Sequence, residues 1–315
     1  MSKVVGIDLG GTGLRAGVVA EDGTITRLRQ FAHGGFPRPV DAIDRIAKAI
    51  EAVSDGEKVD AVGVGVAAWV ERGTGFIARA PNLGWLNVPF GELLERRLGV
   101  PVVVHNDLKA IAWGEYRFGS GRGANTLFVV FVGTGVGSAI VTEGTLWTGA
   151  RGFGGELGHV RVGPDDGPPC GCGRRGCLES YVGGSALARR AEALRAQGAL
   201  RSIGSAEVVP EITAAHLEAA ARRGDADARA LLEQGGDLLG RALGAVVNLL
   251  NPDVLLFGGG VWNASESVQD AVRVGIELTS HPDLRKSVRI VESALGDAAG
   301  VSGSADLARR RLSSP

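Results

Sequence analysis

Two segments of this chain repeat one pattern. Residues 4–24 and 128–145 each read as an apolar strand, a Gly-Thr-Gly turn, a second strand, an acidic-Gly turn and the start of a third strand. Self-similarity of this kind predicts two structurally related domains. Turn glycines leave backbone N–H groups unobstructed, so each turn could approach the oxygens of a phosphate. One such turn is most often a plain hairpin, but two turns that faced each other could hold a polyphosphate.

All three cysteines lie in one Gly-rich loop, with a histidine just upstream. The order is His159, Cys170, Cys172, Cys177, and the spacers are rich in turn-forming Gly and Pro. Imidazole nitrogen and thiolate sulfur are the ligands of closed, tetrahedral zinc sites. The alternative is three buried free cysteines beside an exposed histidine, which does not explain their confinement to one short loop. We therefore predict a structural Zn²⁺ site made of these four residues.

Composition narrows the choice of ligand and compartment. The 315 residues suit two domains, and 34 Lys+Arg against 35 Asp+Glu leave no basic excess for nucleic acid or a membrane surface. The longest uncharged run, residues 126–142, is shorter than the roughly 18 apolar residues of a membrane span. The first residues reach Asp8 without the apolar core of a signal peptide. Since a thiolate zinc site favours a reducing compartment, we expect a cytoplasmic protein.

The hydrophobic pattern predicts the main helices and strands. Buried strands are expected at residues 59–66, 100–104 and 254–257. Helices are expected at residues 40–53, 108–116, 185–197, 213–221, 226–250 and 302–312. The last helix is expected to pack back on the N-terminal domain.

The cysteine loop also carries a resemblance to a known family. Its run CGCGRRGCLE from Cys170 to Glu179, preceded by GELGH at 155–159, resembles the signature of the ROK family of repressors, open reading frames and sugar kinases, and most closely its bacterial glucokinases. Matching segments extend from Gly6 to Gly260. The paired glycine hairpins likewise resemble those of actin, hexokinase and Hsp70. The resemblance implies an α/β chain with a two-domain, ribonuclease H-like fold and an interdomain cleft.

The resemblance also implies a domain division. Residues 1–105 are expected to form a small N-terminal α/β domain, joined by a C-terminal helix at about 302–315. Residues 106–301 are expected to form a large α/β domain that carries the zinc loop. We further expect a homo-oligomer, either a dimer or a tetramer.

Asp107 is the candidate catalytic residue, because it follows a predicted strand and opens a predicted helix. An aspartate there is usually only an N-cap. A strand end that points into a cleft is, however, where α/β enzymes place their chemistry. The resemblance implies ATP-dependent phosphorylation of glucose at the 6-hydroxyl, with Asp107 as general base.

Other functions remain open from sequence. The substrate could be another hexose, such as N-acetylmannosamine, N-acetylglucosamine, mannose or fructose. A sugar-responsive transcription repressor is disfavoured, because no helix-turn-helix precedes the first strand. A non-catalytic sugar-binding protein would not need two phosphate cradles.

The resemblance assigns polar side chains and glycines to the ligands. Amides and carboxylates read sugar hydroxyls, and Asp8 is expected to approach Mg²⁺ through water. The expected sugar-binding residues are Asn82, Asn106, Asp107, Glu156, His159 and Glu179. The expected nucleotide-binding residues are Asp8, Gly10, Gly11, Thr12, Gly13, Gly133, Thr134, Gly135, Gly137, Gly258, Gly259 and Gly260. For the last three glycines, a plain strand-to-helix connection is an equal alternative.

Three positions depart from the family pattern. Gly13 stands where relatives often carry Lys or another polar residue, which leaves the role of Arg15 open. Residues 67–69, Ala-Ala-Trp, replace a Pro-Gly turn in one wall of the sugar pocket. Lys109 could point at phosphates or at solvent.

Overall fold

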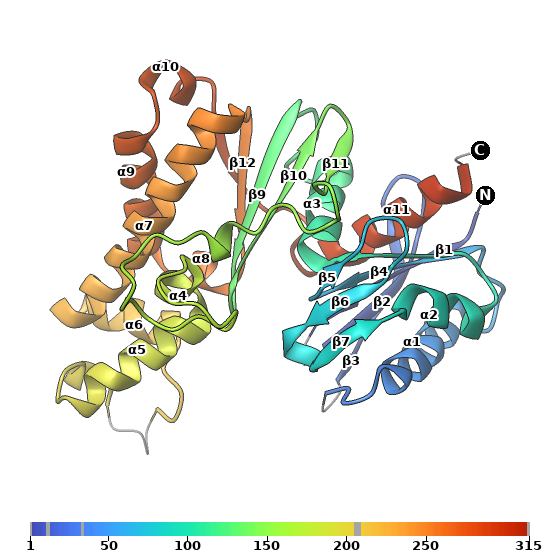
Figure 1. Cartoon of the computed structure of the whole chain (residues 1–315), viewed down its shortest axis with the longest axis horizontal. Helices are drawn as coiled ribbons and strands as arrows, with labels where there is room; N and C mark the ends of the chain where they lie inside the picture. The colour runs from blue at the N-terminus through green and yellow to red at the C-terminus, as the bar shows by residue number, and fades with distance from the viewer. Residues whose placement is uncertain (1, 11–12, 33–34, 205–208, 314–315) are drawn as a thin grey trace. The chain divides into compact units, whose positions relative to one another are not determined.

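The computed structural model describes residues 2–10, 13–32, 35–204 and 209–313. The chain is an α/β protein that divides into two compact units (Figure 1). The first unit comprises Met1–Val129, Ala139–Gly155 and Ser293–Pro315, and the second comprises Val130–Ser138 and Glu156–Glu292. Residues 106–129 therefore pack with the first unit. The domain boundary expected after residue 105 remains a prediction.

A five-stranded sheet forms the centre of the first unit, in the order β3-β2-β1-β4-β8. The strands are β1 (Val4–Leu9), β2 (Gly13–Val19), β3 (Ile25–Ala32), β4 (Ala61–Val66) and β8 (Val102–Asn106). The first three strands pair antiparallel and follow the strand and turn order predicted from residue 4 onward. The strands β4 and β8 run parallel to β1, so the ends of β1, β4 and β8 lie at one edge of the sheet.

Helices cover both faces of this sheet. They are α1 (Pro39–Ser54), α2 (Phe90–Leu98), α3 (Asp107–Phe118) and α11 (Ala299–Ser313). Side chains alternate along β1, so Val5 and Ile7 pack in one buried cluster with α1 while Val4 packs with Val301 of α11. Glycine is required beneath α11, because a Cβ at Gly63 would lie 1.8 Å from the carbonyl oxygen of Ser304. The prediction that the last helix packs on the N-terminal sheet is confirmed.

A small antiparallel sheet of three strands also belongs to the first unit. It consists of β5 (Trp69–Val70), β6 (Ile77–Ala80) and β7 (Trp85–Val88), with the 3₁₀ turn η1 (Pro81–Leu83) between the last two strands. Trp85 is buried, and its indole Nε1 donates to the carbonyl oxygen of Phe36 at 2.8 Å. The buried indole of Trp85 therefore anchors this turn.

The second five-stranded sheet repeats the order of the first, as β11-β10-β9-β12-β13. Its strands are β9 (Thr126–Val132), β10 (Val136–Thr142), β11 (Thr145–Trp147), β12 (Val254–Gly258) and β13 (Arg289–Glu292). The internal repeat read from the sequence thus corresponds to neighbouring strands in the same order in both sheets.

The second unit is rich in helices. They are α4 (Glu179–Val182), α5 (Gly184–Ala196), α6 (Ala214–Arg222), α7 (Ala226–Leu250), α8 (Gly260–Ala264), α9 (Glu266–Thr279) and α10 (Pro282–Arg285). The two long helices α7 and α9 pack closely, and a Cβ at Gly240 would lie 2.4 Å from the carbonyl oxygen of Val272. In the described ranges, no helix combines the length and apolar character that crossing a membrane requires.

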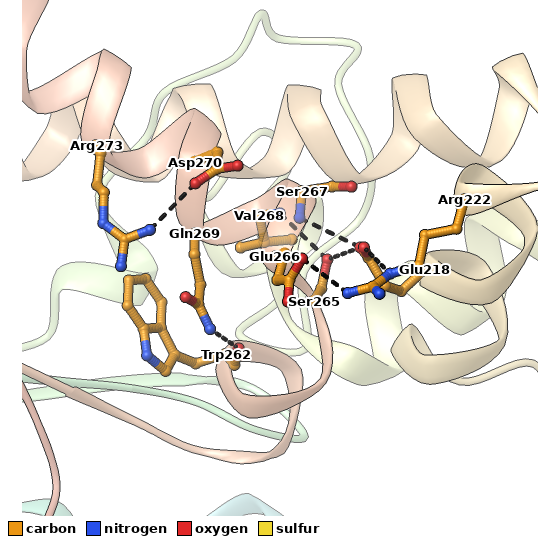
Figure 2. Close-up of polar contacts among 10 residues, drawn as sticks. All are labelled: Glu218, Arg222, Trp262, Ser265, Glu266, Ser267, Val268, Gln269, Asp270 and Arg273. Atoms are coloured by element: carbon orange, nitrogen blue, oxygen red, sulfur yellow. Dashed lines mark hydrogen bonds and ion pairs between the residues drawn. The ribbon is translucent and has the colours of Figure 1, made fainter. Parts of the chain in front are cut away.

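A buried carboxylate ties α6 to the start of α9. Figure 2 shows Glu218 of α6 facing Ser265, whose hydroxyl donates to it at 2.7 Å, and Arg222 lies at 3.1 Å on its other side. The same carboxylate accepts the backbone N–H of Ser267 at 3.3 Å. Burial alone would raise the pKa of Glu218, but these hydrogen bonds hold it below its ordinary value.

Candidate active site and metal cluster

Asp107 is the first residue of α3, directly after β8. The helix is capped by Asn106, whose side-chain Oδ1 accepts the backbone N–H of Lys109 at 3.2 Å. Asp107 Oδ1 instead accepts the Asn106 amide and the backbone N–H of Leu108, each at 2.9 Å. Because a neighbouring side chain caps the helix, an N-cap role does not account for Asp107.

The Asn106 amide also reaches the segment that departs from the family pattern. Its Nδ2 donates to the carbonyl oxygen of Ala68 at 3.3 Å, so Asp107 and Ala68 share one amide group. Trp69 follows Ala68, and its ring centroid lies 6.4 Å from that of Phe153. The 67–69 segment therefore packs beside the start of α3.

The side chain of Lys109 is buried and does not point at solvent. Only 3% of the residue is exposed, and its Nζ donates to the carbonyl oxygen of Gly152 at 2.8 Å. Its charge also acts on His105. Desolvation and the positive charge of Lys109 lower the pKa of the His105 imidazole to about 4, although part of the residue remains accessible.

Asp8 and Arg15 face each other across β1 and β2. Arg15 Nη1 lies 3.3 Å from the Asp8 carboxylate, and its Nη2 lies 3.0 Å from Asp297. Burial raises the pKa of Asp8 and outweighs the opposite effect of Arg15. The Gly10 amide donates to the Gly13 carbonyl at 2.9 Å, which closes the turn. The predicted residues Gly11 and Thr12 lie outside the described residues.

The second glycine turn is tied to the helices that follow the cysteine loop. The Gly133 carbonyl accepts the Gly184 amide at 2.8 Å, and the Thr134 carbonyl accepts the Ser185 amide at 3.0 Å. Glu179 accepts the backbone N–H at Val136 at 3.0 Å, and a Cβ at Gly135 would lie 2.2 Å from its Oε2. A side chain at position 135 would therefore displace the Glu179 carboxylate.

The third glycine turn follows β12. Gly259 has a φ of +97°, and a Cβ there would lie 2.5 Å from the carbonyl oxygen of Val132. A Cβ at Gly258 would lie 2.6 Å from the ring of Phe131. Close packing on β9 accounts for both glycines. By contrast, a Cβ at Gly260 would meet no atom within 4 Å.

The four predicted zinc ligands converge. One ligand atom from each of His159, Cys170, Cys172 and Cys177 lies within 4.8 Å of the others. The Cys172 and Cys177 sulfurs are 3.7 Å apart, and His159 Nδ1 lies 3.6 Å from the Cys170 sulfur. A tetrahedral ion with Zn–S bonds of about 2.3 Å places two sulfurs about 3.8 Å apart. The donor set and its spacing therefore fit Zn²⁺.

The expected sugar-binding residues divide between the two units. Asn82, Asn106 and Asp107 belong to the first unit, and Asn82 is an exposed residue of η1. Glu156, His159 and Glu179 belong to the second. Within the second unit, Glu179 connects the metal cluster to the glycine turn, because its Oε1 lies 3.7 Å from the Cys170 sulfur.

The sequence did not indicate that residues 148–155 contact the start of α3, beside Asp107. The contact between Lys109 and Gly152 joins residues 43 positions apart, so no local sequence pattern predicts it. The only available signal was the density of glycines, with Gly149, Gly152, Gly154 and Gly155 close together.

A hollow of about 590 Å³ lies elsewhere in the second unit, on α6, α7 and α9. The lining residues are Glu218, Arg222, Arg229, Glu233, Asp237, Glu266, Ser267, Asp270, Ala271 and Val274. None of the predicted site residues is among them. Several of its acids pair with arginines, including Asp270 with Arg273 at 3.1 Å (Figure 2).

Comparison with known proteins identifies the family. A model described as the ROK family matches residues 4–311. This chain belongs to the ROK family. A glucokinase of Thermotoga maritima is 37% identical over 319 residues, with 98% of each chain covered. A glucokinase of Streptomyces coelicolor is 36% identical over 322 residues, again with 98% of each chain covered.

Solved ROK structures agree with this assignment. The ROK family glucokinase from Streptomyces griseus, in complex with glucose and AMPPNP, is similar with a TM-score of 0.82 and 37% identity. The likeness covers 98% of this chain and 100% of that chain. The predicted ROK membership and the predicted α/β, two-domain actin/hexokinase-like fold are both confirmed.

Proposed function

We propose that this ROK protein is an ATP-dependent sugar kinase that phosphorylates glucose at its 6-hydroxyl. Similarity over nearly the full chain to glucokinases supports the reaction class. The observation that carries the proposal is the arrangement at Asp107. Its carboxylate accepts two hydrogen bonds while Asn106 caps the helix, which suits a base held in a defined orientation.

The proposed chemistry asks little covalent work of the protein. ATP supplies the phosphoryl group that is transferred, and Mg²⁺ neutralises charge on the phosphates. Asp107 accepts the proton of the sugar 6-hydroxyl. Asn82, Asn106, Glu156, His159 and Glu179 hold the other hydroxyls, since amides and carboxylates pair with them strongly.

The glycine turns are the proposed phosphate cradles. Gly10, Gly13, Gly133 and Gly137 would let phosphate oxygens approach the backbone of each turn closely, and a Cβ at Gly133 would meet no atom within 4 Å. Gly11 and Thr12 belong to the same proposed cradle. Asp8 is the residue proposed to approach Mg²⁺ through water. The guanidinium of its neighbour Arg15 partly offsets the negative charge of the Asp8 carboxylate.

Zn²⁺ is proposed to be structural, and its four protein ligands suit a closed site. The ion would hold His159 and, through Cys170, Glu179 in register for the sugar. We also propose a cytoplasmic homo-oligomer, a dimer or tetramer.

One assay tests the function. ADP release is measured with purified protein over glucose, mannose, fructose, N-acetylglucosamine and N-acetylmannosamine. We expect the highest kcat/KM for glucose. A higher value for an N-acetylated sugar would replace glucose by that substrate. If no sugar led to ADP release and the protein bound operator DNA in a sugar-dependent way, the repressor alternative would be favoured.

A further inference from the structure

Lys109 occupies a position in which a cation is costly. Its side chain is almost fully buried, and an ammonium group is expensive to remove from water unless hydrogen bonds replace the lost hydration. The group donates to the carbonyl oxygen of Gly152, in the segment that follows β11. The contact with Gly152 therefore ties the segment after β11 to the start of α3.

The segment around Gly152 is shaped by close contacts. Gly152 has a φ of +101°, and a Cβ there would lie 2.5 Å from the carbonyl oxygen of Val70. The Arg72 amide donates to the carbonyl of Arg151 at 3.1 Å. The Gly154 amide donates to Thr148 at 2.8 Å. Residues 148–155, the clamp loop, thus pack on the end of β5.

The clamp loop completes a circuit of contacts that begins and ends at the start of α3. Asp107 shares the Asn106 amide with Ala68, the next residue is Trp69, and the Trp69 ring packs at a tilt of 41° against Phe153. Phe153 directly follows Gly152, and Lys109 holds Gly152 to the helix that Asp107 begins. Every residue in this circuit of contacts lies in the first unit.

We infer that Lys109 is a positioning residue that sets sugar specificity through the clamp loop. It holds Phe153 beside Trp69. These two rings would form a wall of the site at Asp107 that leaves room for glucose and not for a bulky N-acetyl group. The inference rests on the proposed function, because it concerns the sugar side of the same site. Arg151, whose guanidinium lies 5.3 Å from the centroid of the Phe153 ring, packs on that aromatic residue.

The test compares Lys109→Met with Lys48→Met. Methionine keeps much of the lysine volume but cannot donate to Gly152. Lys48 is an exposed lysine of α1 in the same unit and serves as the control. Hydrogen exchange without sugar comes first: Lys109→Met should speed exchange in residues 69–72 and 148–155, and Lys48→Met should not. Unchanged exchange in Lys109→Met would overturn the clamp.

Kinetics then test specificity. We expect Lys109→Met to raise the KM for glucose with a smaller change in kcat. The kcat/KM preference for glucose over N-acetylglucosamine should fall about 10-fold to 100-fold, the range that pocket contacts of this size control. An unchanged preference, or a lower melting temperature alone, would reduce Lys109 to a structural role and overturn the inference.

A second variant keeps the test decisive if Lys109→Met does not fold. Phe153→Ala removes the wall and leaves Lys109 in place, so it should show the same loss of preference. A Phe153→Ala enzyme with wild-type preference would refute the wall. A wild-type protein that phosphorylates no sugar would refute the proposed function instead, while the exchange experiment would still judge the clamp.

Discussion

For individual residues, the decisive observation is that Asn106 and not Asp107 caps α3. The expected general base therefore has a neighbour that orients it and is not the N-cap of the helix. The same neighbour reaches Ala68, so one amide connects the catalytic candidate to the unusual 67–69 segment.

Asp107→Asn separates a base from a structural residue. Asparagine preserves the shape and can still hydrogen-bond the sugar, but it cannot accept the proton. We expect kcat to fall about 100-fold to 10,000-fold while glucose affinity, measured by calorimetry, changes little. The melting temperature serves as the control for folding. Near-normal turnover would rule out Asp107 as the base.

His105 should make the fold sensitive to acid. Its pKa in the folded protein is about 4, below the ordinary value near 6.5, so between these pH values the unfolded chain binds a proton that the folded chain does not. Stability from this group is therefore complete above pH 6.5 and is lost as the pH falls toward 4. Urea unfolding should show a loss on the order of 1–2 kcal/mol between pH 7 and 5 that His105→Gln lacks. Parallel pH curves for both proteins would contradict this.

For the helices and loops, close backbone approach explains many of the glycines. The helix α11 lies on α3 so closely that a Cβ at Gly303 would be 1.8 Å from the carbonyl oxygen of Ala110. Such contacts permit tight packing, but they tolerate no added atom.

Gly303→Ala should therefore destabilise the protein by about 1–3 kcal/mol, as overpacking of a tight interface does. Gly260→Ala is the matched control, because its Cβ meets no atom within 4 Å and alanine favours a helix. Chemical denaturation of both variants measures the difference. Equal stabilities would show that α11 can shift away from α3 without cost.

The cysteine loop behaves as one unit if it binds metal. Purified protein should contain about one Zn²⁺ per chain, and Cys172→Ser should lose the ion and weaken glucose binding. Arg174→Ala changes an exposed residue of the same loop and should retain the ion. Elemental analysis that finds no zinc in active wild-type protein would reject the site.

At the level of the entire chain, ligand binding should stabilise the fold. A sugar that binds only the folded protein adds about 2.7 kcal/mol at 100 times its Kd. Glucose should therefore raise the melting temperature more than N-acetylmannosamine does at equal concentration. The reverse order would point to the N-acetylated hexose as substrate. The measurement needs no turnover, so it is independent of the kinetic assay.

Local patterns in the sequence were enough for much of this protein. Strands and helices follow from hydrophobic periodicity, so α1, α7 and β12 were predicted nearly to their ends. The strand repeat predicted two similar sheets, and the spacing of three cysteines and one histidine predicted a cluster that the fold does assemble. The helices α2 and α9 carry similar periodicity, yet they were not predicted.

Contacts between distant residues depended on the folded chain. Nothing near Lys109 in the sequence indicates that its ammonium meets Gly152, and nothing near Asp107 indicates that Ala68 shares its amide partner. These pairs form because β8, β5 and the loop after β11 end near the start of α3, which depends on the packing of the whole unit. A short sequence window encodes the preference of a segment for helix, strand or turn, whereas the partner of a buried polar group is determined by which segments the core brings together.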